Sequence, residues 1–136
     1  LSRANFSQAD LKGANLSEAN LNWTNFGGAN LSGAYLNGAQ LKGANLDRVN
    51  FGGANLSDAN LSQARLLVAD LRCSNLAGAN LTGANLGGAD LSETNLSEMV
   101  RVTNAESLRK RFEIQSVPTE AQGENKKEDV MSEIVV

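Results

Sequence analysis

Residues 29–46, ANLSGAYLNGAQLKGANL, repeat a single five-residue unit, and this unit decides the fold. A leucine stands at every fifth residue of the stretch, and an alanine stands two residues before each leucine. The rule extends in both directions: Leu or Phe fills all twenty fifth positions from Leu1 to Leu96, with Phe at 6, 26 and 51. We call these residues the centres of the units.

The two residues before each centre are also restricted. The residue two positions before the centre is Ala in fifteen of nineteen units, and the exceptions are small: Thr24, Val49, Ser74 and Thr94. The residue directly before the centre is Asn in thirteen units and Asp in three, and it differs only at Tyr35, Gln40 and Arg65. The unit is therefore A-(N/D)-L-x-x.

A period of five fits neither the 3.6 residues of a helical turn nor the two-residue alternation of a strand. Each unit must therefore contain a turn. Glycine stands two residues after the centre in nine units, and a type II turn needs a positive φ at its third residue. The sequence predicts short extended segments joined by corners.

The units resemble those of the pentapeptide-repeat family, as ANLSEANL, ANLSGAYL and ANLTGANL illustrate. The resemblance covers residues 1–98 and implies an all-β fold, a right-handed quadrilateral β-helix of four units per coil, with the centre and Ala side chains inward. About five coils at ~4.8 Å spacing give a solenoid roughly 25 Å long. We number the faces by their centres: face one starts at Leu1, face two at Phe6, face three at Leu11 and face four at Leu16. Phe6 and Phe26 should stack within face two.

The repeat lapses after Leu96, and the remaining sequence predicts two further segments. Thr103 to Glu106 has the form of a capping box, so we expect a C-terminal cap over residues 99–117, with an α-helix near 104–113. A partner-binding helix is the alternative interpretation. Residues 118–136 predict a flexible tail, because residues 119–129 are polar and charged. The apolar end of the tail, residues 130–136, is interpreted either as a strand that docks on this or another copy or as a disordered end. The chain opens within the pattern, and we expect further sequence before Leu1.

Composition argues against several kinds of site. The chain has no histidine and a single cysteine, Cys73, which excludes a Cys/His zinc cage and an intramolecular disulfide. Asp70 and Asp90 share one outward position in successive coils, but a convex prism supplies no cleft around them. We expect no catalytic residue, no cofactor and no metal. No apolar run is long enough to span a membrane.

The outward exceptions to the repeat are the candidate binding residues. Trp23, Tyr35, Leu67 and Val68 are apolar where the unit usually places a small or polar residue. With four units per coil, Leu67 and Val68 should lie with Arg65 in the fourth coil, next to Arg48. Free drift of surface positions on a scaffold is the alternative interpretation.

Charge is divided between pairs of faces. Faces one and two carry four basic residues and one acidic residue, whereas faces three and four carry two basic and seven acidic residues. The basic side is too sparse and non-aromatic for nucleic acid, so a protein partner is expected.

The predicted function is a non-enzymatic scaffold for protein–protein interaction. The resemblance offers two alternatives: a DNA-mimicking binder of type II topoisomerase such as gyrase, which in the family is usually a dimer through the C-terminal end, or a repeat segment of a larger adaptor protein. A homodimer through the C-terminal end is thus an option for this chain. The compartment stays open, either cytoplasmic or the thylakoid lumen if a targeting segment has been removed.

Overall fold

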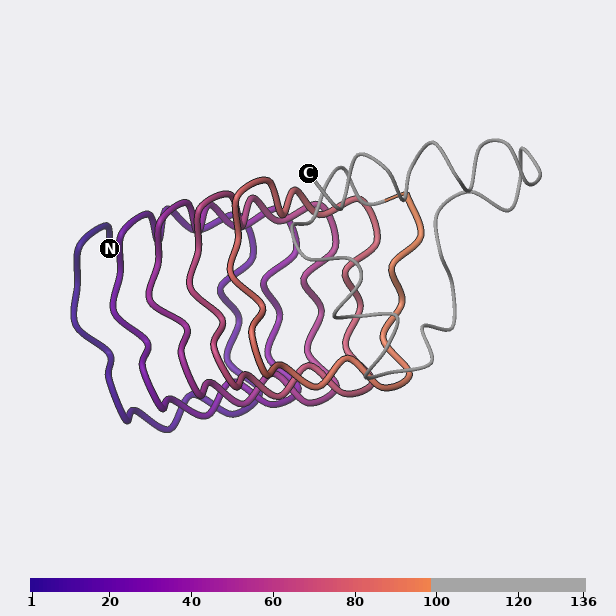
Figure 1. Ribbon diagram of the computed structural model, residues 1–136. Helices are drawn as coiled ribbons and strands as arrows, with labels where there is room; N and C mark the ends of the chain where they lie inside the picture. Colours follow the sequence, from indigo (N-terminus) through magenta and orange to yellow (C-terminus); the bar gives the residue numbers. More distant parts are fainter. Residues whose placement is uncertain (99–136) are drawn as a thin grey trace.

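The computed structural model describes residues 1–98, which form a solenoid of stacked coils (Figure 1). The coils are joined by fifteen parallel bridges between residues i and i+20, from Asn5↔Asn25 to Asn75↔Asn95. These single-residue bridges are the only strand elements in the described part, and no helix occurs there. The register of twenty confirms four units per coil.

Every corner has the same turn geometry. The backbone N–H two residues before each centre donates to the carbonyl of the preceding centre, as from Ala4 to Leu1, at 2.9–3.2 Å across the series. All twenty residues two positions after a centre have φ between 57° and 73°. Because only the third residue of each turn has a positive φ, the turns are type II. Eleven of these twenty residues are not glycine.

Three kinds of backbone hydrogen bond join successive coils. The centre donates to the coil that follows, as from Phe6 to Asn25 at 2.7 Å, and the corner residue does the same, as from Gln8 to Gly27 at 2.9 Å. The residue before the centre donates to the coil that precedes it, as from Asn25 to Ala4 at 2.9 Å. Each coil therefore bonds only to its two neighbours, as expected of a solenoid.

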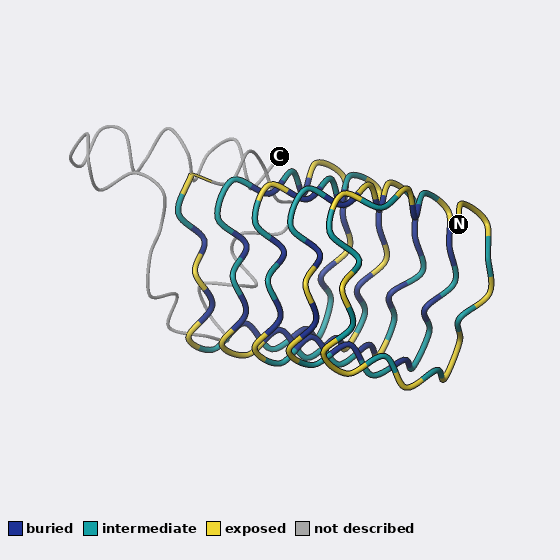
Figure 2. Ribbon diagram, turned by 180° about the vertical axis from the view of Figure 1, so that it is seen from behind, coloured by how far each residue is buried: buried dark blue, intermediate teal, exposed yellow. Residues whose placement is uncertain are grey.

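The interior is a column of leucine, phenylalanine and alanine side chains. From Leu21 onward the centres and the small residues before them are buried (Figure 2), whereas in the first coil Leu1 is exposed and the other inward side chains are only partly buried. The rings of Phe6 and Phe26 stack with centroids 5.4 Å apart and planes inclined by 14°, which confirms the prediction. Fully burying one leucine contributes roughly 1.5 to 3 kcal/mol, so the interior supplies most of the stabilisation.

Three polar side chains lie inside the solenoid without an unpaired group. Thr24 donates to the Leu1 carbonyl at 3.1 Å, and Ser74 and Thr94 both donate to the Leu71 carbonyl, at 2.7 and 2.8 Å. No buried side-chain nitrogen or oxygen lacks a hydrogen-bond partner in residues 1–98. These substitutions therefore avoid the cost of an unsatisfied buried polar group.

The predicted cap over 99–117, its helix near 104–113 and the predicted tail over 118–136 lie outside the described residues.

Candidate functional site

The outward Asn and Asp side chains hold the corners in place. In all sixteen units that have Asn or Asp before the centre, the side-chain Oδ1 accepts a hydrogen bond from the backbone N–H two residues later. The donors and acceptors are at 2.8–3.3 Å. Such Asx turns satisfy an N–H that the turn itself leaves free. These side chains are therefore part of the scaffold.

Where the Asn is missing, a side chain from the preceding coil can take over its role. Gln40 replaces Asn, and the Lys42 N–H donates instead to Asn22 Oδ1 at 2.9 Å. Arg65 replaces Asn, and the Leu67 N–H donates to Asp47 Oδ1 at 3.0 Å. The Arg65 guanidinium also pairs with Asp47. In both cases the backbone N–H is thus bonded to a side chain twenty residues earlier.

Corner side chains lie over the corner of the following coil. A Cβ added at each of six corner glycines would come within 4 Å of the side chain twenty residues earlier. The pairs are Gln8 over Gly28, Glu18 over Gly38, Trp23 over Gly43, Asp58 over Gly78, Gln63 over Gly83 and Val68 over Gly88. A Cβ added at Gly13, Gly33 or Gly53 would have nothing within 4 Å. The residue twenty positions before Gly33 or Gly53 is itself a glycine, and no residue stands twenty positions before Gly13 in this sequence. Each corner side chain therefore covers the corner of the next coil toward the C-terminus.

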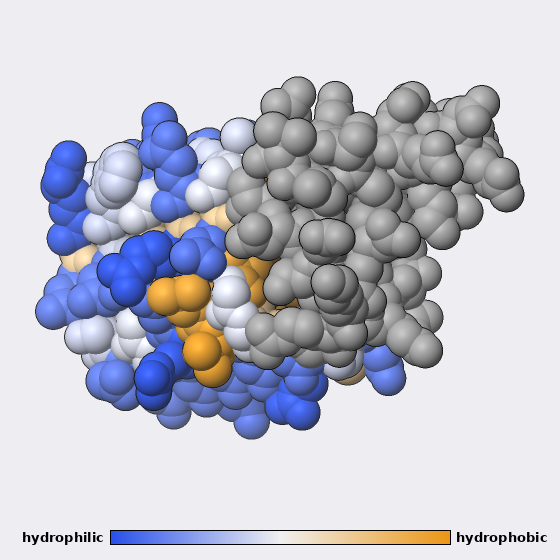
Figure 3. All heavy atoms as spheres, in the orientation of Figure 1, coloured by the Kyte–Doolittle hydropathy of each residue, from blue (hydrophilic) through white to orange (hydrophobic). Residues whose placement is uncertain are grey.

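Leu67 and Val68 form an apolar edge at the corner that follows face two, and Figure 3 shows apolar side chains as a small patch on a largely polar face. Val68 is 59% exposed and has φ +59°. A β-branched residue rarely adopts this conformation, because its branched Cβ is crowded by the backbone. Leu67 and Val68 lie over Gly87 and Gly88, where an added Cβ would be 3.0 and 3.2 Å from their methyl carbons.

Two arginines flank the apolar edge. Arg65 stands before Leu66 in the same coil and pairs with Asp47, while Arg48 belongs to the preceding coil and its N–H donates to the Leu67 carbonyl at 2.9 Å. Arg48 is exposed and makes no ion pair within residues 1–98. The structure thus brings together four of the six candidate residues.

The other two candidates lie elsewhere. Trp23 occupies the corner that follows face one, where its ring covers Gly43, and it is 49% exposed. Tyr35 replaces the Asn of a unit on face four and is 54% exposed. Neither residue is continuous with the apolar edge.

Face three carries a hollow of about 510 Å³ whose lining includes Asp70, so the expectation that no cleft adjoins this aspartate was wrong. Its floor is formed by Ser32, Asn50, Gly52 and Gly53, and its wall is formed by Asp70, Arg72, Cys73, Ser92 and Glu93. The floor is low because three glycines follow one another in this corner column, so that no side chain covers Gly33 or Gly53. We call this region the face-three hollow.

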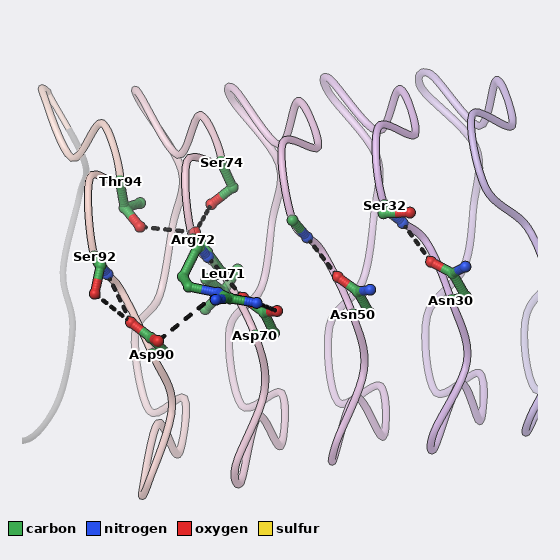
Figure 4. A network of polar contacts seen from close by, with 11 residues as sticks. Asn30, Ser32, Asn50, Asp70, Leu71, Arg72, Ser74, Asp90, Ser92 and Thr94 are labelled. Atoms are coloured by element: carbon green, nitrogen blue, oxygen red, sulfur yellow. Dashed lines mark hydrogen bonds and ion pairs between the residues drawn. The ribbon is translucent and has the colours of Figure 1, made fainter.

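The wall of the face-three hollow is a charged network (Figure 4). Arg72 donates to Asp70 through Nε at 2.9 Å and through Nη2 at 2.7 Å, and its Nε lies 3.8 Å from Asp90 Oδ2. The Arg72 side-chain hydrogen bond lowers the pKa of Asp70 below its ordinary value, against a smaller opposing effect of burial. The two aspartates predicted to lie together therefore do so, with an arginine between them.

Cys73 ends the wall. Its thiol is exposed and lies 3.6 Å from Glu93 Oε2. Desolvation, and secondarily the Glu93 charge, raises the pKa of Cys73, which disfavours the reactive thiolate. No group of three or more His, Cys, Asp or Glu side chains able to hold a metal ion occurs within residues 1–98.

Comparison with known families places the chain. A family model described as pentapeptide repeats matches eight copies over residues 1–38, 24–63 and 68–98. The chain belongs to the pentapeptide-repeat family. Its solved members have the right-handed quadrilateral β-helix, which is the fold the repeat predicted. A search of curated proteins finds no match.

Several solved pentapeptide-repeat proteins are similar to the chain. One from the cyanobacterium Cyanothece 51142 is 40% identical with a TM-score of 0.64, covering 65% of this chain and 60% of that one. HetL of Nostoc, which is involved in heterocyst differentiation regulation, is 38% identical with a TM-score of 0.59, covering 69% and 47%. One from the Arabidopsis thaliana thylakoid lumen is 27% identical with a TM-score of 0.71, covering 97% and 86%. The matches thus span about half to three fifths of the two cyanobacterial chains.

Two features of the surface were not predicted from the sequence, namely the role of Asp47 and the face-three hollow. Asp47 carries no special signal in its own unit, and its role depends on a residue eighteen positions later. The face-three hollow could have been found by aligning the corner residues every twenty positions, which shows Gly13, Gly33 and Gly53 in succession. No helix long and apolar enough to cross a membrane occurs in the described coils.

Proposed function

We propose that this pentapeptide-repeat protein is a non-enzymatic scaffold that binds a protein partner through the apolar edge, Leu67 and Val68, flanked by Arg48 and Arg65. The observation that carries the proposal is the combination at Val68 of high exposure and a positive φ. Nine corners of the solenoid have glycine at this position. A β-branched residue here lowers stability relative to glycine, and strained residues cluster at binding sites.

The partner expected at this edge has an apolar pocket with acidic groups at its rim. Val68 is exposed at a corner and Leu67 beside it is half-buried, so a concave partner surface fits this edge better than a flat one. Arg48 is exposed and makes no ion pair in the described coils, and it supplies a positive charge beside the apolar side chains. Interface centres are commonly apolar with a polar rim that includes arginine.

The test is a paired substitution that restores the repeat. Leu67→Ser with Val68→Gln reproduces the outward residues that Ser62 and Gln63 already supply one unit earlier, so the fold should be retained. Tyr35→Asn is the matched control, because it removes an exposed aromatic residue on another face and also restores the repeat. We expect wild type and Tyr35→Asn to capture the same protein from lysate, and the double variant to lose it.

Circular dichroism and thermal unfolding of all three proteins verify that the solenoid is intact. Equal capture by the double variant and wild type would refute the assignment of the binding surface to the apolar edge. Loss of capture in Tyr35→Asn would instead place the surface on face four.

A further inference from the structure

We propose that the face-three hollow binds an arginine side chain presented by a protein partner. This site is separate from the apolar edge. That the arginine belongs to a protein rests on the proposed function. The hollow itself rests on its own shape and charge. Three observations support it: a floor in which no side chain covers Gly53, an excess of carboxylate in the wall, and the position of the hollow across face three from the apolar edge.

The floor of the hollow admits a flat group close to the backbone. Gly52 and Gly53 are adjacent, and a Cβ built on Gly53 would meet nothing within 4 Å. The side chains that cover other corners are absent here, because the preceding corner residue is Gly33. The floor N–H groups of Gly52 and Gly53 already donate to Asn50 Oδ1 and the Arg72 carbonyl, at 2.8 and 2.9 Å. They are therefore not free to bind an anion.

The wall favours a cation. It contains the carboxylates of Asp70 and Glu93 and the guanidinium of Arg72, and the carboxylate of Asp90 adjoins it. Arg72 engages Asp70 with two hydrogen bonds and reaches Asp90 only at 3.8 Å. The contact of Glu93 is with the Cys73 thiol, a weak donor that leaves its charge in place. Three negative charges thus face one positive charge.

An arginine fits this combination better than a point charge. Its planar guanidinium can lie on exposed peptide groups while its N–H groups bind carboxylates in a fork. A single exposed pair of this kind contributes little, so the hollow suits one side chain of a larger interface. Val68 and Cys73 are the corner residues at the two ends of face three in the fourth coil, and one partner can contact both surfaces.

The test uses N-acetyl-arginine amide as a probe, titrated into the isotopically labelled full chain and followed by NMR of backbone amides. We expect saturable shifts at the Gly52 and Gly53 amides with millimolar affinity. N-acetyl-citrulline amide, which has the same shape without the charge, should leave these amides unchanged. Glu93→Gln should weaken arginine binding by about fivefold, the order expected for one exposed pair.

Glu18→Gln is the matched control, because Glu18 is also an exposed glutamate at a corner with a positive φ but lies after face four. It should leave the probe affinity unchanged. The proposal is overturned if the Gly52 and Gly53 amides do not respond, if citrulline shifts them equally, or if Glu18→Gln weakens binding as much as Glu93→Gln. The Leu67→Ser/Val68→Gln variant should bind the probe normally, so failure of the apolar edge and failure of the hollow are distinguishable.

Discussion

Replacing Gly43 with alanine should destabilise the solenoid more than replacing Gly33, although both glycines occupy the same turn position. Their φ angles are +67° and +64°, so the strain of placing an alanine Cβ in the left-handed region is shared, at about 1–2 kcal/mol. The surroundings differ. The new Cβ would lie 2.3 Å from Cε3 and Cζ3 of Trp23 at position 43, whereas at position 33 it would meet nothing within 4 Å.

The additional cost at Gly43 follows from displacement of the indole. A contact of 2.3 Å cannot persist, and Trp23 is half exposed, so its ring can swing toward solvent and give up its contact with the backbone. Exposing on the order of 50 Å² of ring surface at ~25 cal/mol per Å² costs about 1 kcal/mol. We therefore expect losses of about 1–2 kcal/mol for Gly33→Ala and about 2–3 kcal/mol for Gly43→Ala.

Urea denaturation measures both losses, and intrinsic fluorescence identifies their cause. Trp23 is the single tryptophan of the chain, so its emission reports only this corner. Emission from folded Gly43→Ala should shift to longer wavelength as the ring enters water, while Gly33→Ala should match wild type. In a Trp23→Ala background, measured by circular dichroism, Gly43→Ala should cost no more than Gly33→Ala.

The two substitutions could instead destabilise the protein equally, with the emission of Gly43→Ala unchanged. This result would refute the conclusion that a corner is covered by the side chain twenty residues earlier. An excess cost at Gly43 that persists without Trp23 would assign the effect to the backbone of that corner.

Three further predictions concern single residues near the proposed surfaces. Val68→Gly should raise the free energy of unfolding by about 0.5–1 kcal/mol, since relief of the positive φ exceeds the added entropy of the unfolded chain, while partner capture weakens; equal or lower stability in thermal unfolding would contradict this. Asp47→Ala should cost about 1–2 kcal/mol because the Leu67 N–H loses its acceptor, whereas Asp47→Asn keeps an oxygen there and should cost less than half as much in urea denaturation. Asp70 has its pKa lowered from 3.8 by Arg72, so its pair stabilises the fold above that pH and the stabilisation is lost as pH falls through the folded-state value; the melting temperatures of wild type and Asp70→Asn should differ at pH 7, and the difference should shrink as the pH falls below 3.8.

The interior could be predicted from the sequence because one rule repeats twenty times. A centre such as Leu46 and the alanine before it have inward positions fixed by the period alone, and the register of twenty follows from four equal sides. The stacked pair Phe6 and Phe26 was predictable for the same reason. The nine corner glycines also indicated the turn type.

The outside could be predicted only in part. The pattern placed Leu67 and Val68 beside Arg48 and Arg65, because column positions follow from the register. It did not reveal that Asp47 takes over a hydrogen bond from the missing Asn, since this depends on how two side chains from different coils orient. The positive φ of the non-glycine corners was not predicted either, because a valine such as Val68 does not by itself indicate that conformation.

Because the four sides of the solenoid follow the same five-residue pattern, a duplication can move outward residues to another face while the core pattern stays the same. Residues 21–30, 46–55 and 71–80 echo one another at intervals of 25, which is one coil plus one unit. A duplication of that length places each centre on another centre position, so the hydrogen bonds and the core are unchanged. The outward residues instead advance by a quarter turn, and Trp23, Arg48 and Cys73 now occupy successive corners. Insertion of a single unit would rotate every later surface residue about the axis, so such a protein can re-aim a binding site without redesigning its fold.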